Sequence, residues 1–326
     1  MRYAWGMTPY ALVIGESLID VVEEGGGRAT EHPGGSAANV AVALARLGRP
    51  VRFATSFADD PHGRLLAEHL AASGVELAAD PHVVRRTSTA TATINSGGAA
   101  SYAFDVDWRL GEVRMDPTPV VVHVSSFGAV LEPGATSVRA AVAALRGRAV
   151  VSYDINLRAA VTGAGPEVRD RVLELVSAAD LVKASDDDLA ELFGTSDVEP
   201  VARELLERGP AAVVVTRGGE GATCFLPGGR SVRADVVPVR VADTIGAGDT
   251  FSAAMIDALW DSLATPSLGE TNDLAGSGGT TRPIRWAQRA AAPGVWQQVL
   301  EYAARVAAVT VSRPGADPPH RRDLDT

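Results

Sequence analysis

Two aspartates, Asp243 and Asp249, bracket a loop of small residues in the stretch DTIGAGDTF, which spans residues 243–251. Apolar residues with helical spacing follow at once, so we expect the loop at the N-terminus of a buried helix. Unpaired backbone amides and the positive end of a helix dipole bind anions at such a place. Asp249 therefore either caps the helix or works beside a bound anion, and spacing alone leaves both interpretations open.

Phosphoryl transfer is the reaction that these groups would suit. It depends mainly on positioning and on stabilising negative charge, with one base for the attacking hydroxyl. The amides of Gly246, Ala247 and Gly248 would form the anion hole, and Asp249 would be the base. General-base assistance is typically worth about a hundred- to ten-thousand-fold in rate.

Other polar residues follow predicted strands. YDINLR places Asp154, Asn156 and Arg158 just beyond a strand expected to end near Tyr153, and VIGESLID places Asp20 at the end of the first strand region. Ligands of open α/β sheets bind beyond the carboxyl ends of the strands, so these side chains are expected at one edge. Each aspartate taken alone is explained more readily as a turn residue than as a ligand.

A second glycine-containing stretch, HPGGSAAN, precedes a predicted helix. Gly34 and Gly35 would allow close backbone approach to a ligand, and Asn39 falls near the start of the helix. Helix capping is the competing explanation for Asn39.

Lys183 is the only lysine among the 30 basic residues, and no Gly-Lys-Ser/Thr sequence contains it, which excludes a Walker A loop. Three aspartates at 186–188 follow Ser185 and suit the first turn of a helix. A water-mediated hold on Mg²⁺ is the alternative for this charge run. TRGGEG at 216–221 joins two predicted strands, either as a plain hairpin or as a nucleotide contact.

Short apolar, β-branched runs alternate with alanine-rich helical stretches along the chain, which predicts an α/β protein with a mostly parallel sheet covered on both faces. Residues 21–33 and about 84–106 are instead expected to form antiparallel strands outside this sheet, as a lid. Residues 264–283 are rich in Gly, Ser, Thr and Pro and are expected to form a mobile surface loop.

Composition excludes several functions. The net charge is −10 with no basic cluster, which disfavours nucleic-acid binding. No apolar run reaches the roughly 18 residues of a membrane span. The N-terminus has no signal-peptide pattern, and the single cysteine, Cys224, suits a reducing compartment, so a cytoplasmic protein is expected.

Taken in order, PGGSAANVAVALARLG, YDINLR, KASDDDL, DTIGAGDTF and SRPGADPP resemble the ribokinase-like carbohydrate kinases of the PfkB family. The resemblance implies one domain over 11–319, with lid segments at about 20–33 and 84–112 and flexible ends at 1–10 and 320–326. It implies a three-layer α/β/α sandwich with a small β-sheet lid. The implied reaction is ATP-dependent phosphorylation of a sugar hydroxymethyl group.

The resemblance also assigns roles by matching position. Asp249 becomes the catalytic base, and the amides of Gly246, Ala247 and Gly248 become the anion hole. The implied sugar-binding residues are Asp20, Gly34, Gly35, Asn39, Tyr102, Phe104 and Arg158. The implied nucleotide-binding residues are Lys183, Ser185, Thr216, Gly218 and Gly221. Asp188 would hold Mg²⁺ through water, and a K⁺ site would use Asp243 with main-chain oxygens near Thr310, Arg313 and Gly315.

Within the family the motifs are most similar to those of fructokinases, which implies D-fructose as acceptor at its 6-hydroxyl, with MgATP and K⁺. The family's Asn-x-x-Glu element reads Ser185-x-x-Asp188 here. Ribose, 2-keto-3-deoxygluconate, a nucleoside or a sugar phosphate are the alternative acceptors. A sugar-binding regulator that keeps the pocket without the chemistry is the alternative of another class. Family members also dimerise through the lid, which implies a homodimer.

Overall fold

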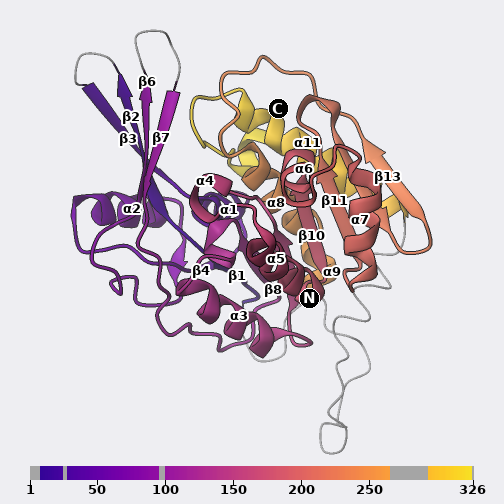
Figure 1. Ribbon diagram of the computed structural model, residues 1–326, viewed down its shortest axis with the longest axis horizontal. Coiled ribbons are helices and arrows are strands. Elements are labelled where there is room, and N and C mark those ends of the chain that lie inside the picture. Colours follow the sequence, from indigo (N-terminus) through magenta and orange to yellow (C-terminus); the bar gives the residue numbers. More distant parts are fainter. Residues whose placement is uncertain (1–7, 25–27, 95–99, 265–292, 325–326) are drawn as a thin grey trace, which may run out of the picture.

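The computed structural model of this chain describes residues 8–24, 28–94, 100–264 and 293–324, and all structural statements below concern these residues. A nine-stranded sheet in the order β13-β12-β11-β10-β9-β8-β1-β4-β5 forms the centre of the molecule (Figure 1). Its strands are β1 (Ala11–Ile14), β4 (Val51–Ala54), β5 (Glu76–Leu77), β8 (Val121–Ser125), β9 (Val150–Asp154), β10 (Leu181–Ser185), β11 (Ala212–Thr216), β12 (Ala222–Leu226) and β13 (Arg230–Ala234). The strands from β5 to β11 are parallel, and β12 and β13 add antiparallel pairs at one end.

Helices cover both faces of this sheet. They are α1 (Ser36–Arg46), α2 (Pro61–Ala72), α3 (Gly134–Leu145), α4 (Ala159–Thr162), α5 (Pro166–Ala178), α6 (Asp186–Phe193), α7 (Val198–Glu207), α8 (Ala247–Ala258), α9 (Trp260–Ala264) and α11 (Pro293–Val311), with short 3₁₀ helices η1 (Phe127–Ala129), η2 (Gly218–Glu220) and η3 (Arg321–Leu324). None of these helices is both long and apolar enough to cross a membrane.

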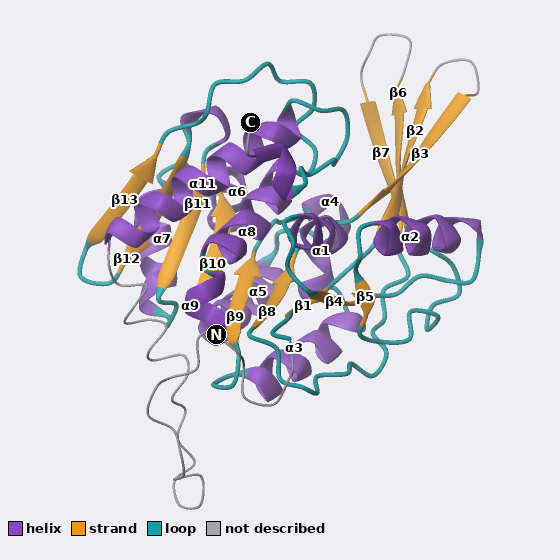
Figure 2. Ribbon diagram, turned by 180° about the vertical axis from the view of Figure 1, so that it is seen from behind, coloured by secondary structure: helices purple, strands orange, loops and turns teal. Residues whose placement is uncertain are grey.

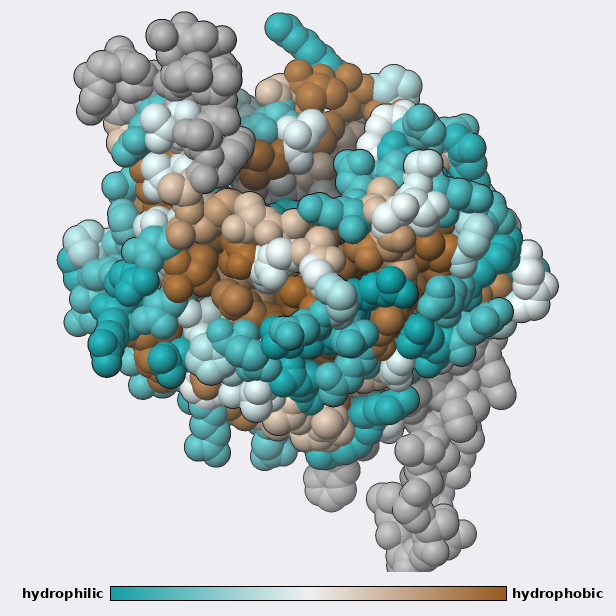
Figure 3. Space-filling view, in the orientation of Figure 1, coloured by the Kyte–Doolittle hydropathy of each residue, from teal (hydrophilic) through white to brown (hydrophobic). Residues whose placement is uncertain are grey.

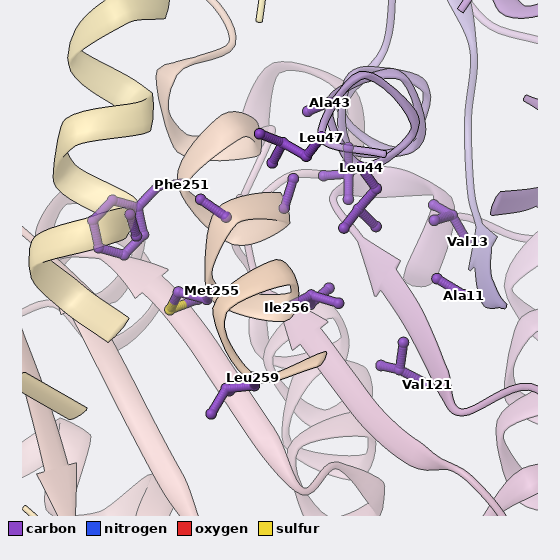
Figure 4. Close-up of a cluster of buried hydrophobic side chains, with 14 of the residues drawn as sticks. Ala11, Val13, Ala43, Leu44, Leu47, Val121, Phe251, Met255, Ile256 and Leu259 are labelled. Atoms are coloured by element: carbon purple, nitrogen blue, oxygen red, sulfur yellow. The ribbon is translucent and has the colours of Figure 1, made fainter. Parts of the chain in front are cut away.

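Strand β1 shows how the sequence builds three layers. Ala11 and Val13 point into one hydrophobic core, and Leu12 and Ile14 point into the other. Because successive side chains of a strand face opposite sides, an unbroken apolar run requires cover on both faces. Residues of α1, α8 and α11 line the first core, part of which Figure 4 shows, and α3, α5, α6 and α7 line the second. The predicted three-layer α/β/α architecture is confirmed.

A separate four-stranded sheet, in the order β3-β2-β6-β7, stands away from the body of the molecule (Figure 1). It contains β2 (Leu18–Glu24), β3 (Arg28–Gly34), β6 (Thr89–Ile94) and β7 (Ala100–Asp105). The β2–β3 and β6–β7 pairs are antiparallel as predicted, but β2 and β6 pair in parallel, so the prediction of a wholly antiparallel sheet was wrong. The sheet consists of two antiparallel hairpins, β2–β3 and β6–β7. The hairpins pair through β2 and β6, which run in the same direction.

The small sheet is anchored at its base by apolar contacts. Leu18 and Ala90 are buried together with Phe127 of η1, and Phe104 of β7 packs against this group. Figure 2 shows that the parallel strands β8, β9 and β10 point toward the side of the molecule from which the small sheet rises. The carboxyl ends of these strands therefore lie where the small sheet could cover a ligand.

The chain ends differ from the sequence expectation where the structure describes them. A flexible end was expected over residues 1–10, yet Tyr10 is only 3% exposed and its hydroxyl donates to the carbonyl of Pro117 at 2.6 Å. A flexible end was also expected over 320–326, yet Arg321 of η3 pairs with the buried Asp257 at 2.6 Å. Residues 1–7, residues 325–326 and nearly all of the predicted mobile loop at 264–283 lie outside the described residues.

Candidate active site

The GAGD stretch forms the first turn of α8. Gly246 is the residue before the helix and has φ 74°, a left-handed conformation that glycine adopts without strain. A Cβ atom at Gly246 would also lie 2.8 Å from the Cβ of Ala316, so the position has no room for a side chain. Among the described residues, nothing accepts a hydrogen bond from the amides of Gly246 and Gly248, whereas Ala247 donates to the carbonyl of Thr244 at 3.3 Å. This turn therefore has free amides for an anion.

Asp249 is 5% exposed and receives hydrogen bonds from three side chains. Ser36 Oγ at 2.8 Å and Asn156 Nδ2 at 3.2 Å donate to its Oδ1. Asn39 Nδ2 donates to its Oδ2 at 2.8 Å. The donors come from the first turn of α1 and from the loop after β9, so three chain segments meet at one carboxylate.

These contacts show whether Asp249 and Asn39 are helix caps. The side chain of Asp249 caps no amide of α8, because Gly246 holds the capping position without a side-chain hydrogen bond. Gly35 holds that position in α1, so Asn39 is not a helix cap either. Helix capping is therefore the wrong explanation for both residues.

Burial raises the pKa of Asp249 above its ordinary value. The hydrogen bond from Asn39, the charge of Arg158 and the hydrogen bond from Ser36 lower it again, and the charge of Asp154 raises it. The raised pKa makes the Asp249 carboxylate a stronger base, while the hydrogen bonds that it accepts stabilise its ionised form. Both properties suit a group that accepts a proton.

Asp20 lies in a different element from the one predicted. It is on β2 of the small sheet, because the first main-sheet strand already ends at Ile14; its prediction as a main-sheet strand end was wrong. The structure nevertheless brings it to the same site. Burial raises the pKa of Asp20 to about 6, with His32 and Arg158 lowering it and Asp249 raising it, so these charges are neighbours.

The two glycines before α1 are required by close packing. A Cβ at Gly34 would collide with the carboxylate of Asp20. Gly35 has φ 100°, and a Cβ there would lie 2.8 Å from the carbonyl oxygen of Glu16. Both glycines thus let the α1 turn approach β1 and β2, which is what places Asn39 beside Asp249.

Lys183 lies beneath the GAGD turn. Its Nζ donates to Asp154 Oδ2 at 2.8 Å, and Ser252 Oγ of α8 donates to the same oxygen at 2.8 Å. A Cβ built on Gly248 would be 3.3 Å from Lys183 Nζ, so the ammonium group lies against the turn. Among the described residues, nothing donates a hydrogen bond to the buried Asp154 Oδ1.

The Ser185–Asp188 stretch forms a capping box at the start of α6. Asp188 Oδ2 accepts the Ser185 amide at 2.8 Å, and Ser185 Oγ accepts the Asp188 amide at 3.0 Å. Asp188 Oδ1 accepts the amide of Leu157 at 2.8 Å, and the residue is 8% exposed. The prediction of a helix start is confirmed, though Asp188 is buried rather than solvated, and its Mg²⁺ role stays a prediction.

The TRGGEG stretch joins the antiparallel strands β11 and β12, as predicted. Thr216 ends β11, Gly218 begins η2, and Gly221 has φ 87° with no room for a Cβ beside the Ala234 carbonyl. The nucleotide contact of Thr216, Gly218 and Gly221 remains a prediction.

The predicted cation site does gather in space. Asp243 Oδ1 accepts the amide of Ile245 and Oδ2 accepts that of Gly315, both at 3.0 Å. Asp243 also donates its own amide to the carbonyl of Val311, and the buried Thr310 hydroxyl donates to Thr250. Arg313 lies on the same segment, but its side chain pairs with Asp317 and Asp323. These residues thus lie close together, and cation binding by the Asp243 carboxylate and the main-chain oxygens of this segment remains a prediction.

The two remaining lid residues are placed less directly. Phe104 packs with Leu18, Ala90 and Phe127 at the base of the small sheet. Tyr102 lies on β7, and its side chain is outside the described residues. Figure 3 shows the surface hollowed between the small sheet and the C-terminal half of the molecule.

Sequence reasoning gave no role to Ser36 or Glu16. Ser36 donates to Asp249, and Glu16 is a buried carboxyl that accepts the Ser36 amide at 3.1 Å and the Gly128 amide at 3.0 Å. Burial raises the pKa of Glu16 to about 7. Both residues stand inside motifs that were noticed, GESLID and PGGSAAN, but a serine or glutamate there carries no signal of its own.

Comparison with known proteins identifies the family of this chain. The chain matches the pfkB family of carbohydrate kinases over residues 8–322. It is 33% identical over 256 residues to a fructokinase of Klebsiella pneumoniae, covering 76% of this chain and 83% of that protein. It is 33% identical over 269 residues to a fructokinase of Rhizobium leguminosarum bv. trifolii, covering 78% and 81%.

Solved structures show the same fold. A fructokinase double mutant from Vibrio cholerae O395, in its fructose-, ADP- and potassium-bound form, superposes with a TM-score of 0.74 at 26% identity, covering 98% of this chain and 97% of that one. A fructokinase with bound ATP from Xylella fastidiosa superposes with a TM-score of 0.77 at 22% identity, covering 98% of each chain. The chain belongs to the pfkB family of carbohydrate kinases.

Proposed function

We propose that this protein is an ATP-dependent fructokinase, which transfers the γ-phosphoryl group of MgATP to the 6-hydroxyl of D-fructose. The observation that carries the proposal is the buried Asp249 carboxylate in the same helical turn as the free amides of Gly246 and Gly248. A base and an anion hole within one turn are the parts that phosphoryl transfer needs. The curated relatives named fructokinase, and a fructokinase structure with fructose and ADP bound, support fructose as the acceptor.

The sugar would lie between the small sheet and the strand ends. Asp20 and Asn39 offer a carboxylate and an amide for sugar hydroxyls, and the charge of Arg158 acts on both Asp20 and Asp249. Asn39 already donates to Asp249, so a sugar hydroxyl bound there would be next to the base. Tyr102 and Phe104 of the small sheet would cover the sugar.

In the reaction, Asp249 takes the proton of the sugar hydroxyl while the oxygen of that hydroxyl attacks the γ-phosphorus. The bond from that phosphorus to the bridging oxygen of ADP breaks, and the electron pair leaves with ADP. The amides of Gly246 and Gly248 would stabilise the negative charge on the transferring group. The ammonium group of Lys183 lies against Gly248 and would also act on this charge, although Asp154 already compensates part of the ammonium charge.

The described residues fit the two cations that the reaction would use. Mg²⁺ bound to the phosphates would neutralise their charge, and Asp188 together with the unpartnered Asp154 Oδ1 could hold its water ligands. The carboxylate of Asp243 and the nearby carbonyls fit a K⁺ ion at the base of the anion hole. A potassium-bound fructokinase of the same fold supports this assignment.

The remaining nucleotide contacts and the assembly belong to the same proposal. Ser185, Thr216, Gly218 and Gly221 would line the nucleotide, because β10, β11 and the hairpin after β11 adjoin Lys183. The outer strands of the small sheet, β3 and β7, each leave one edge unpaired within the described chain, and such edges favour pairing with a second copy. We therefore infer a homodimer through the lid.

ADP release tests the proposal directly. The purified protein is assayed with MgATP across a panel of sugars, with K⁺ and with Na⁺ in its place, beside Asp249→Ala. We expect fructose-dependent turnover that requires Asp249, because removal of a general base costs about a hundred- to ten-thousand-fold. Turnover with another sugar only would overturn fructose and keep the mechanism. Sugar binding without ADP release would favour the non-catalytic regulator.

A further inference from the structure

Glu16 occupies a position that no substrate can reach. It lies two residues after the end of β1 and is 2% exposed, and two glycines, Gly35 and Gly128, approach it closely. A Cβ on Gly35 would lie 2.8 Å from its carbonyl oxygen, and one on Gly128 would lie 2.5 Å from its Oε2. A Cβ on Gly15 would lie 2.5 Å from the Cβ of Ala37, so the chain just after β1 packs closely against α1.

The carboxylate of Glu16 joins two segments that the sequence separates widely. Its Oε1 accepts the amide of Ser36, the first residue of α1, at 3.1 Å. Its Oε2 accepts the amide of Gly128 in η1 at 3.0 Å. A negative group at the start of α1 also complements the helix dipole, so Glu16 holds the backbone of Ser36 in one place.

Ser36 passes this constraint to the base. Its hydroxyl donates to Asp249 Oδ1 at 2.8 Å and accepts from Asn156 Nδ2 at 2.8 Å. Ser125 Oγ is a second acceptor within reach of the Ser36 hydroxyl, at 3.0 Å. Ser36 has one hydroxyl proton, and the charged carboxylate of Asp249 is a stronger acceptor for it than the Ser125 hydroxyl.

We propose that Glu16 is a positioning residue for the phosphoryl-transfer reaction, acting on the base Asp249 through Ser36. This inference rests on the proposed role of Asp249. Glu16 fixes the backbone of Ser36, and Ser36 fixes the carboxylate that must meet the sugar hydroxyl. Small displacements of reacting groups are costly, since about 1 Å of misplacement loses about a hundredfold in rate.

The test is a double-mutant cycle between Glu16→Gln and Ser36→Ala, measured as kcat and KM with fructose and MgATP. Glutamine keeps the shape of Glu16 but turns one acceptor into a donor that faces an amide donor. We expect E16Q to lower kcat about ten- to a hundredfold with the KM for ATP changed less than about twofold. In the S36A background the same change should cost little more, because the path through Ser36 is already absent.

Asp180→Asn is the matched control. Asp180 is also a largely buried carboxylate, and it accepts the amide of Val151 at 2.7 Å, but it lies before β10, at the opposite end of the sheet from Asp249. D180N should lower stability and leave kcat unchanged. If E16Q does not fold, Glu16→Asp replaces it in the cycle, since the shorter carboxylate keeps the charge but cannot reach both amides.

The outcomes separate this inference from the proposed function. The role of Glu16 would be overturned if the losses of kcat in E16Q and S36A multiplied in the double variant. It would also be overturned if kcat of E16Q were no lower than that of D180N. A wild-type protein that releases no ADP with any sugar would overturn the proposed function, and this inference with it. Losses that fail to multiply, in an active enzyme with unchanged ATP affinity, would support the path from Glu16 through Ser36.

Discussion

Removing the side chain of Arg321 should measurably destabilise the protein, although the family resemblance implied a flexible end there. Its Nη2 donates to Asp257 Oδ1 at 2.6 Å, and its Nε donates to the carbonyl of Leu47 at 3.0 Å. The Asp257 side chain is 1% exposed and also accepts from Arg49 and from the hydroxyl of Tyr302. The C-terminal segment thus connects the end of α1 to α8 and α11.

The magnitude follows from burial. A hydrogen bond to a charged group contributes about 1.5–3 kcal/mol, and an exposed ion pair contributes about 0–1 kcal/mol. The side chain of Arg321 is 44% exposed while that of Asp257 is buried, so the contact lies between these cases. Asp257 keeps its other partners in Arg321→Ala, so we expect a loss of about 2 kcal/mol in the free energy of unfolding.

Urea denaturation of R321A beside Arg322→Ala is the assay. Arg322 adjoins Arg321 in sequence, but its side chain is 82% exposed and lies 3.8 Å from Asp323, so R322A should cost less than about 0.5 kcal/mol. Truncation after Pro319 should cost at least as much as R321A. Equal unfolding midpoints for R321A, R322A and the truncated chain would refute the reasoning and restore the flexible end.

Two further predictions concern the site. Ser36→Ala removes a donor to the ionised form of Asp249 and therefore raises its pKa, so the acid limb of kcat/KM against pH should move up by about one unit; a limb that stays in place would contradict the contact. Gly35→Ala should cost at least about 2 kcal/mol in urea denaturation, because φ is 100° and the Cβ would lie 2.8 Å from the carbonyl oxygen of Glu16. Gly48→Ala, with φ 84° and open space around its Cβ, is the control and should cost about 1 kcal/mol.

The layered fold could be predicted because each main strand carries its evidence locally. Four consecutive apolar residues in β1, all fully buried, already require helices on both faces. The break between β1 and β2 could not be predicted, since Gly15, Glu16 and Ser17 interrupt the apolar run only briefly. Asp20 was therefore assigned to the wrong sheet, although its place near the other polar residues of the site was expected.

The site divides in the same way. The GAGD turn was predictable because a left-handed glycine, free amides and a following helix all lie within a few residues of one another. The partners of Asp249 were not, since Ser36 and Asn39 are 213 and 210 residues away and meet it only through the packing of α1 against α8. Long-range hydrogen bonds of this kind depend on the relative position of two helices, which no local pattern contains.

The crowding of negative charge at the site accounts both for a need for bound cations and for part of the rise in the pKa values of its carboxyls. Buried or largely buried carboxyls crowd the strand ends, namely those of Glu16, Asp20, Asp154, Asp188 and Asp249. The triphosphate of ATP would bring further negative charge to the same place. Among the described residues of the site, Lys183 and Arg158 carry the positive charges. Burial, together with the neighbouring carboxylates, raises the pKa values of Glu16, Asp20 and Asp249, so their ionisation is less favourable than in water. Bound Mg²⁺ and K⁺ would offset part of the negative charge and so favour the ionised form of Asp249 that acts as the base. An ATP affinity that falls steeply when both cations are withdrawn, while the protein stays folded, is the direct consequence.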